Sequence, residues 1–427
     1  MRHPCSGDGF DGNARTRSLA RWRTACLSMA TALLLVLAQP AGAQEGEPQP
    51  AAPDARPRLQ FYGFVQMDGG YDFGRVDPKY YDRLRTSALP AAPDQFGGNG
   101  SAYFSVRQTR LGAKSRVPTA AGPLSATLEV DLVGAGPKAG QTTIRLRHAF
   151  GELGALGAGQ YWSPFVDPDV SPEIFESFRP PGQPFARSVQ VRWTPMVGDT
   201  RVTVAIEKPG ARADGGDYTD QIVDRHVKFR FPVPELAGSV WRGGRWGHVQ
   251  VAGLWRRMRW DDVTGDEYDL TGSAAGYGVN LTSLLRLGRH VVRVQYAVGR
   301  GIENYLNDST ADIAIRFDDG NPRTPLEGVA LPVQAFTGYL ESRLGPARVL
   351  VGCGRQAIDN VEGQLPASYH AGSYATATLV LTPAAGVTLA TEYQWGRREN
   401  ASDGWTFDDH RVQVSVRYRF SVAADGS

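Results

Sequence analysis

Cysteine is scarce in this chain of 427 residues, which contains three. Two of them, Cys5 and Cys26, lie in an N-terminal segment that we expect to be removed, so Cys353 is left alone. A single cysteine excludes an intrachain disulfide and a cysteine-based metal site. Long apolar runs are missing too, because no later stretch reaches the ~18 consecutive apolar residues of a transmembrane helix. The sequence therefore predicts neither a disulfide framework nor a bundle of membrane helices.

Signatures of catalysis are also missing. The sequence contains no G-x-S-x-G, no H-E-x-x-H, no Walker A and no G-x-G-x-x-G motif. Its seven histidines are scattered, one in the N-terminal segment and six on separate predicted strands or at their ends. We predict that the protein is not an enzyme and that it carries no cofactor and no metal. A nucleophile beside a histidine on a barrel wall stays open as an alternative, because spacing in sequence does not exclude it.

An excess of positive charge is lacking as well. The formal net charge is +2, from 46 basic and 44 acidic residues. Removing residues 1–43 takes away five arginines and two aspartates, which leaves 41 basic and 42 acidic residues. The basic balance belongs to the N-terminal segment, so nothing predicts nucleic-acid binding.

The N-terminal segment has the features of an export signal. Four arginines between residues 15 and 23 precede the apolar run 25–38, and Ala41-Gly42-Ala43 fits the cleavage pattern. We predict a signal peptide over residues 1–43. The alternative, a membrane anchor, needs a longer apolar run. Residues 44–58 are rich in proline and polar side chains, and we interpret them as a short periplasmic lead.

What the chain has in quantity is alternation. In residues 411–420, valine and aromatic side chains share one face, and arginine, glutamine and serine share the other. This period of two predicts a β-strand with one apolar and one charged face. In a transmembrane barrel the apolar face meets lipid and the charged face lines the lumen.

The same pattern recurs along the chain and predicts an all-β protein, a transmembrane antiparallel β-barrel. Compact Pro/Gly turns alternate with longer polar loops, as expected for turns on one side of a membrane and loops on the other. A propeller is the alternative, but no ~40-residue repeat is visible. We assign the barrel to residues 59–420 and a tail to 421–427. The sixteen predicted strands are 59–73, 101–117, 123–134, 142–153, 156–163, 187–195, 200–208, 222–232, 246–260, 268–284, 289–302, 332–344, 347–358, 370–382, 386–397 and 410–420.

Four segments together resemble the DcaP-like porin family of Gram-negative outer membranes. They are Leu59–Phe73, Arg107–Lys114, Arg145–Gly151 and Gly159–Phe165. The resemblance covers roughly residues 59–200 and is topological beyond. It implies a homotrimer of sixteen-stranded barrels that takes up small anionic solutes such as dicarboxylates. The chain departs from the family in lacking a long N-terminal coiled coil and in continuing past Phe420.

Alternation places many basic side chains in the lumen. The lumenal acids by the same rule are fewer, namely Glu129, Asp131, Glu207, Asp224 and Glu392. A positive wall concentrates anions, and arginine binds carboxylates through two parallel hydrogen bonds. The alternative is that these are ordinary solvated wall charges. The predicted pore-lining basic residues are Arg145, Arg147, Arg192, Arg201, Lys228, Arg230, Arg256, Arg293, Arg348, Arg411, Arg417 and Arg419.

The Pro-rich loop 164–186 is our predicted constriction loop. The resemblance implies that this third loop folds inward and narrows the barrel. It would carry five charged residues towards the arginine wall: Asp167, Asp169, Glu173, Glu176 and Arg179. The alternative is a loop that lies over the mouth.

Two residues conflict with the alternation. Arg107 and His148 fall on faces that otherwise belong to lipid, where a charge costs ~2–4 kcal/mol. Either a bulge shifts the register, or these faces meet a neighbouring protomer. We predict the second, a protomer interface.

Taken together, these patterns predict a passive porin for small hydrophilic solutes, with a preference for anions such as dicarboxylates. We expect Sec-dependent export, insertion into the outer membrane, and contacts with outer-membrane lipid, lipopolysaccharide and other copies of the chain, but none with nucleic acid. Two alternatives stay open. One is a phosphate-type selective porin, which would need lumenal lysine, and the other is a closed structural or adhesive barrel.

Overall fold

The computed structural model describes residues 57–425 apart from 177, 225, 266–267 and 319. The predicted signal peptide and nearly all of the lead lie outside the described residues. Among those described, no helix is long and apolar enough to cross a membrane.

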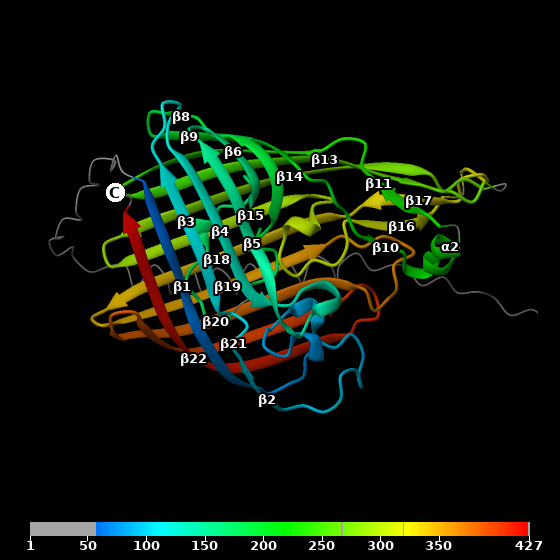
Figure 1. The fold of residues 1–427 in the computed structure, drawn as a ribbon. Helices are drawn as coiled ribbons and strands as arrows, with labels where there is room; N and C mark the ends of the chain where they lie inside the picture. Colours follow the sequence, from blue (N-terminus) through cyan, green and yellow to red (C-terminus); the bar gives the residue numbers. More distant parts are fainter. Residues whose placement is uncertain (1–56, 177, 225, 266–267, 319, 426–427) are drawn as a thin grey trace, which may run out of the picture. The chain divides into compact units, whose positions relative to one another are not determined.

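The described chain forms a closed antiparallel barrel of sixteen strands, which confirms the predicted fold class. Consecutive strands are neighbours throughout, and the first strand pairs with the last to close the sheet (Figure 1). The barrel strands are β1 (Arg58–Asp72), β2 and β3 (Ser101–Ser105 and Arg110–Val117, one interrupted strand), β4 (Leu124–Val133), β5 (Thr142–Leu153), β6 (Leu156–Trp162), β7 (Arg187–Trp193), β9 (Thr200–Glu207), β12 (Glu235–Gly244), β13 (Gly247–Asp261), β14 (Gly272–Leu287), β15 (His290–Arg300), β18 (Pro332–Leu344), β19 (Ala347–Ile358), β20 (Tyr369–Ala384), β21 (Val387–Asn400) and β22 (Thr406–Asp425).

Smaller elements lie in the connections. A separate three-stranded sheet joins the fourth loop (208–234) to the sixth loop (301–331). Its strands are β10 (Ala213–Asp214), β16 (Ile313–Phe317) and β17 (Leu326–Ala330). The remaining elements are β8 (Met196–Val197), β11 (Lys228–Arg230), the helix α2 (Thr219–Asp224) and six 3-10 turns, η1 (Pro78–Tyr80), η2 (Thr86–Ala88), η3 (Gly136–Lys138), η4 (Pro168–Val170), η5 (Gly216–Tyr218) and η6 (Glu303–Tyr305).

The alternation of the sequence becomes the two faces of the barrel. In β22, Arg411 and Gln413 are buried inside, whereas Val414 and Tyr418 are 52% and 57% exposed on the outer face. Successive side chains of a strand point to opposite sides, so the outer face presents an apolar band to lipid. Short turns gather at the end of the barrel that holds the C-terminus, and the long loops gather at the other end (Figure 1).

The eighth strand was predicted wrongly. Residues 222–232 were expected to cross the barrel, but the crossing strand is β12, Glu235–Gly244, which pairs with β9 and β13. The expected segment instead contains α2 and the three-residue β11. Pro232 and Pro234 lack the N–H groups that a ladder needs, so the pairing restarts after them.

The last strand is longer than expected. β22 pairs with β1 from Asp72↔Arg411 to Arg58↔Asp425, five residues beyond Phe420. Residues 421–425, which the sequence analysis set apart as a tail, continue the strand that closes the barrel.

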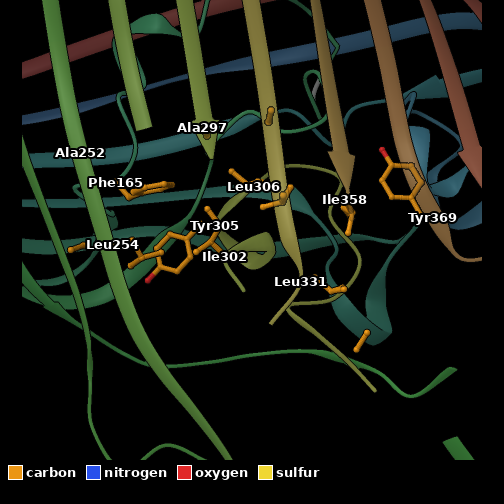
Figure 2. Packing of buried hydrophobic residues seen from close by; sticks show 14 residues of the cluster. Phe165, Ala252, Leu254, Ala297, Ile302, Tyr305, Leu306, Leu331, Ile358 and Tyr369 are labelled. Carbon is orange, nitrogen blue, oxygen red and sulfur yellow. The ribbon is translucent and has the colours of Figure 1, made fainter. Parts of the chain in front are cut away.

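Apolar side chains fill part of the lumen (Figure 2). Inward residues of the strands, such as Leu254 and Val333, lie in one cluster with Phe165 of the third loop and Tyr305 and Leu306 of the sixth. Phe165 and Tyr305 meet edge to face with their ring centroids 5.9 Å apart. These two loops therefore occupy one side of the barrel interior.

Candidate functional site: the constriction beside the third loop

The third loop (163–186) crosses the lumen and is fixed at its near end by polar contacts. The Asp167 carboxylate lies 2.8 Å from Nε2 of His248 on β13 and accepts a hydrogen bond of 2.6 Å from Thr282 on β14. The amide of Asn280 donates to the carbonyl of Phe165 at 2.8 Å. Asp167 therefore faces β13 and β14 and not the arginine wall towards which it was predicted to point.

The far end of the loop is fixed by a buried carboxylate. Glu392 on β21 accepts hydrogen bonds from the backbone N–H groups of Phe175 and Glu176, each at 3.0 Å. The amides of Gln108 and Gln413 donate to the carbonyl of Phe175 at 2.6 and 3.0 Å. With both ends held, the loop narrows the barrel instead of lying over its mouth.

Between the loop and the wall of β22, β1 and β3–β5 lies a cavity of about 560 Å³. Eight of the residues that line it are arginines, and three are acids, Asp131, Glu173 and Glu176. No lysine belongs to this lining within the described part of the chain. The eight arginines are Arg83, Arg110, Arg145, Arg147, Arg179, Arg187, Arg417 and Arg419.

Two of the strand carboxylates hold arginines in place. Arg145 binds Asp131 through two hydrogen bonds of 2.9 and 2.6 Å, and Arg147 reaches both Asp131 and Glu129, at 2.9 and 2.6 Å. Arg110 lies 3.5 Å from Glu129. Three guanidinium groups share two carboxylates, so one positive charge is left unbalanced.

Glu173 on the third loop meets three arginines of the opposite wall. Arg348 and Arg417 donate to its carboxylate at 2.7 and 2.6 Å, and Arg419 contacts it as well. The carboxylate balances one of these three charges, so this side of the cavity is also positive.

Arg187 stands out because it has no carboxylate within ion-pair distance among the residues that the structure describes. Its guanidinium instead lies over the rings of Trp162 and Phe185, 5.1 and 5.8 Å from their centroids. One of its nitrogens, Nη1, is buried without a hydrogen-bond partner. An anion that enters the cavity would meet a cation that no protein group neutralises.

Glu176 contributes little negative charge to the cavity. Burial raises the pKa of its carboxyl to about 7, against the opposing effect of hydrogen bonds from the backbone N–H groups of Phe178 and Arg179. Neighbouring Glu392 raises this pKa further, and Arg411 lowers it. A carboxyl with a pKa near 7 is partly neutral at physiological pH.

The twelve predicted pore-lining residues separate into four groups. Arg145, Arg147, Arg417 and Arg419 line the cavity. Arg192, Arg201, Arg293 and Arg348 face inward outside it, beside Glu152, Trp241, Glu341 and Glu173 respectively. Arg256 and Arg411 are inward but fully buried, against Glu235, Asp312 and Asp72. Lys228 and Arg230 are exposed, on the outer side of the sheet.

The placement of Lys228 and Arg230 in the lumen was therefore wrong. Both belong to the short strand β11, which does not cross the barrel but pairs with the last residues of β13. Lys228 lies opposite Asp261, and Arg230 lies opposite Arg259. Asp224, predicted as a lumenal acid, is exposed in α2. These errors follow from the misplaced eighth strand, because a shifted strand reassigns every side chain on it.

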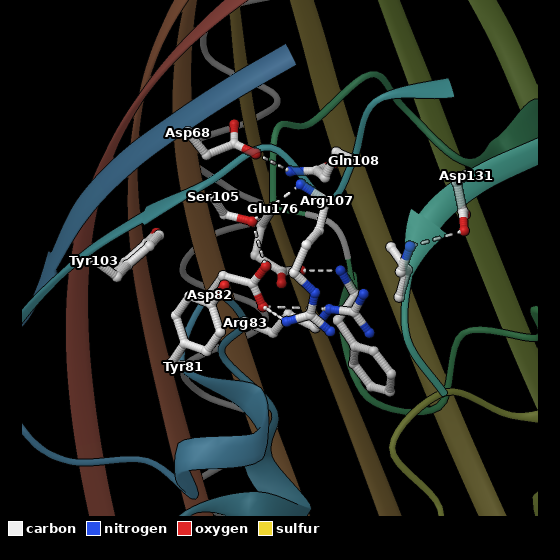
Figure 3. A network of polar contacts seen from close by, with 12 residues as sticks. Asp68, Tyr81, Asp82, Arg83, Tyr103, Ser105, Arg107, Gln108, Asp131 and Glu176 are labelled. Atoms are coloured by element: carbon white, nitrogen blue, oxygen red, sulfur yellow. Dashed lines mark hydrogen bonds and ion pairs between the residues drawn. The ribbon is translucent and has the colours of Figure 1, made fainter. Parts of the chain in front are cut away.

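The predicted interface residues were also misplaced. Arg107 lies in the interruption between β2 and β3 and points inward, where it binds Asp82 at 2.7 Å (Figure 3). In β5 the register shifts between Glu129↔His148 and Val130↔Leu146, so Arg147 is an extra residue and His148 turns inward beside Tyr161. The bulge that we considered as the alternative is the correct explanation for both.

The charged residues of the predicted constriction loop do not act as one group. Glu173, Glu176 and Arg179 line the cavity, while Asp167 is buried against β13 and Asp169 is exposed. Asp167, Asp169 and His248 place one ligand atom each within 4.8 Å of one another, which is the geometry of a metal site. The hydrogen bond between Asp167 and His248 already accounts for two of the three.

Three arginines of the cavity, Arg83, Arg110 and Arg187, were not predicted. Arg110 carried a signal, since it alternates with the outward Leu111 along β3. Arg187 shares the parity of the exposed Val189 and Val191 on β7, so alternation points it outward. Arg83 lies in the first loop (73–100), where no periodicity applies.

Comparison with known proteins agrees with this geometry. The sequence matches the DcaP outer membrane protein family over residues 35–420. The crystal structure of the outer membrane channel DcaP of Acinetobacter baumannii is similar with a TM-score of 0.71 at 20% identity, covering 86% of this chain and 98% of that one. An anion-selective porin from Comamonas acidovorans has a TM-score of 0.54 at 11% identity, covering 85% and 100%. The trimer form of OmpT from Vibrio cholerae has a TM-score of 0.52 at 13%, covering 86% and 100%. No curated protein sequence matches significantly.

Proposed function

The chain belongs to the DcaP outer membrane protein family, and from that premise we propose that its barrel is a passive porin for small hydrophilic solutes that prefers anions, dicarboxylates among them. The protein lies in the outer membrane, as its family and its porin fold establish. Residues 1–43, which are outside the described part, serve in this proposal as the signal for Sec-dependent export.

The observation that carries the proposal is the charge of the cavity. Eight arginines and three acids line it, and one of the acids, Glu176, has a pKa of about 7. A lining of one sign with low-dielectric walls raises the local concentration of ions of the opposite sign. The barrel would therefore admit anions more readily than cations.

Dicarboxylates fit because guanidinium groups reach the cavity from several directions. Arg417 and Arg419 come from β22, Arg145 and Arg147 from β5, and Arg179 from the third loop. Most of these guanidinium groups already bind Asp131, Glu129 or Glu173, yet on both sides of the cavity the arginines outnumber the carboxylates they share. The two carboxylates of one solute can therefore meet unbalanced positive charge on both sides at once, which a monovalent anion cannot.

A homotrimer is part of the proposal. The outer face of β1 and β3–β5 carries a shallow groove of about 360 Å³ lined by small and apolar residues, Ala113, Ala126, Ala149 and Gly151 among them. Such a face permits close approach of a second barrel. Outer-membrane lipid and lipopolysaccharide would surround the rest of the outer face.

The structure weakens one of the two alternatives and favours the other. A phosphate-type porin with lumenal lysine loses its one candidate, because Lys228 is outside the lumen. A closed structural barrel gains support from the apolar cluster that the third and sixth loops form inside. The experiment below distinguishes that alternative from the proposed pore.

The test is the reversal potential of the refolded protein in a planar bilayer under a KCl gradient. We expect the sign set by chloride permeation, with block by added dicarboxylates. Arg187→Gln should lower the chloride preference, since it removes a cavity charge that no carboxylate balances. Arg201→Gln is the matched control, because Arg201 faces inward outside the cavity and stacks on Trp241.

A cation-selective pore, or an equal loss of selectivity in both variants, would contradict the proposed role of the cavity. A folded barrel that conducts nothing would favour the closed structural alternative.

A further inference from the structure

The outer face of the barrel carries a group of basic residues just beyond its apolar band. It consists of five side chains on neighbouring strands, which we call the outer basic patch: Lys228, Arg230, Arg257, Arg259 and Arg300. Four of them are exposed and Arg259 is half-buried. These residues lie on β11, β13 and β15. β11 pairs with β13, and β14 lies between β13 and β15 and pairs with both.

The patch faces outward, not into the lumen. On β13 the inward residues Leu254, Arg256 and Met258 are buried, and Arg257 lies between the last two on the opposite face. On β15, Arg300 has the parity of the exposed Tyr296 and Val298. These cations therefore lie outside the pore.

Exposed aromatic residues show where the patch lies relative to the apolar band of the barrel. Trp246 and Trp255 are exposed at the two ends of the apolar stretch of β13, about nine residues or ~30 Å of strand apart. A tilted strand needs about that length to cross the ~25 Å apolar band, whose borders carry aromatic girdles. Trp255 pairs with Tyr277, which pairs with Arg300, and Arg257 is the next outward residue after Trp255. The patch therefore begins where the apolar band ends, on the side of the long loops.

Within the described part of the chain, few carboxylates contact the patch. Asp261 binds both Arg230 and Arg259, the latter at 3.1 Å. No carboxylate lies within ion-pair distance of Arg257, Arg300 or Lys228 among the described residues, and Arg300 lies 5.9 Å from the ring centroid of Tyr277. The nearby loop acids Asp262 and Asp269 accept hydrogen bonds from backbone N–H groups of their own loop, Thr264, Leu270 and Thr271.

Outward arginines on two other strands have carboxylate partners. Arg355 on β19 and Arg397 on β21 are matched by Glu399 and Asp408, at 2.6 and 3.4 Å. The excess of positive charge on β11–β15 therefore contrasts with the balanced charge on these two strands. The outward residue of β14 opposite Arg257 is the small Ala275, and the one opposite Arg300 is Tyr277, so a ligand that reaches both guanidinium groups would also meet the Tyr277 ring.

We infer that the outer basic patch binds the phosphorylated sugar headgroup of an outer-leaflet glycolipid. A lipid whose chains lie along the apolar band brings its phosphates to the height of Arg257 and Arg300. Guanidinium groups bind phosphate through parallel hydrogen bonds, and each basic residue near an anionic lipid surface adds favourable energy. Trp255 and Tyr277 would lie beside the sugar at the same border.

The test uses native mass spectrometry of the purified protein in mild detergent with added lipid A. We expect lipid A with two phosphates to bind, and lipid A stripped of phosphate to bind far less. The variant Arg257→Gln/Arg300→Gln should bind the bisphosphorylated form roughly 10- to 30-fold more weakly. Arg257→Lys/Arg300→Lys, which keeps the charge, should lose much less.

The matched control is Arg242→Gln/Arg245→Gln, which removes two exposed arginines at the opposite end of β12 and should leave binding unchanged. Equal binding by the patch variant and the unaltered protein, or an equal loss in the control, would overturn the inference. The reversal potential of the patch variant should equal that of the unaltered protein, so failure of the lipid site and failure of the pore proposal are separate results.

Discussion

The ion pair of Arg107 and Asp82 shows how a single residue ties a loop to the wall. Arg107 is 1% exposed and Asp82 4% exposed, and Ser105 donates a further hydrogen bond of 2.7 Å to the same carboxylate (Figure 3). Arg107→Ala would leave the buried Asp82 carboxylate with only the more distant Arg83, 3.8 Å away, and the loss of a buried ion-pair partner costs up to about 3–5 kcal/mol. We expect the first loop to detach, and limited proteolysis within residues 74–100 to become faster.

Lys79→Ala, which alters an exposed residue of the same loop outside this network, should leave the proteolysis rate unchanged. The double variant Asp82→Asn/Arg107→Gln should recover part of the protection, since neither altered residue is charged, whereas Arg83 loses the carboxylate 3.8 Å away. If Arg107→Ala instead dissociates the oligomer while the first loop stays protected, Arg107 lies at a protomer interface after all.

The alternation rule predicted direction well wherever a strand runs without interruption. Arg145, Arg417 and Arg419 lie on the cavity wall, and alternation alone placed them inside. It failed at Arg107 and His148, because one extra residue inverts every later side chain and no local sequence feature marks the bulge. An inward direction also does not mean that a side chain reaches the open lumen. Arg256 points inward but is enclosed by the sixth loop.

At the scale of elements, the third loop is held by a carboxyl that changes charge near neutral pH. Burial raises the pKa of Glu176 from 4.5 to about 7, so the folded loop binds a proton more tightly than the unfolded one. The stabilisation is fully present below pH 4.5 and is lost as the pH rises to about 7, by up to ~3 kcal/mol. We expect current fluctuations of the channel to increase between pH 5 and pH 8.

Glu176→Gln should remove this pH dependence, because the amide stays neutral over the whole range. Asp169→Asn, an exposed side chain of the same loop, serves as the control and should keep it. A pH dependence that persists in Glu176→Gln would assign it to another group, with Glu392 the nearest candidate on the wall.

The family resemblance implied that residues 164–186 enter the lumen. The contacts that hold this loop there were not predicted. Glu392, His248 and Gln413 come from strands far away in sequence. Their partners are chiefly backbone groups of the loop, which no pattern of side chains encodes. No sequence pattern singled out the sixth loop, whose apolar residues, Ile302 and Leu306 among them, also fold into the barrel.

At the scale of the whole molecule, the interior is divided into two unlike halves. One half carries the arginine cavity, and the other holds the apolar cluster of the third and sixth loops. The rule that a barrel interior is polar predicts the first half and misses the second. In the pore that we propose, the path for a solute would lie on the side of β22, β1 and β3–β5, and selectivity would depend on a minority of the inward residues.

Closure of the barrel depends on the residues after Phe420. Residues 421–425 pair with residues 58–62 of β1, which extends the seam between the first and last strands. Deletion of residues 421–427 would leave this edge of β1 unpaired and remove about four or five ladder hydrogen bonds, at ~1 kcal/mol each. We expect a lower yield of folded barrel and a lower temperature for the heat-induced band shift on gels.

Deletion of residues 426–427 alone is the matched control and should leave the band shift unchanged, because the pairs up to Arg58↔Asp425 remain. Val422→Ser in the full chain keeps the ladder and alters only an outward side chain that is 65% exposed, so its effect should be small. If the longer deletion raises the folding yield instead, a terminal Phe420 matters more for assembly than these added pairs, and the seam is complete without them.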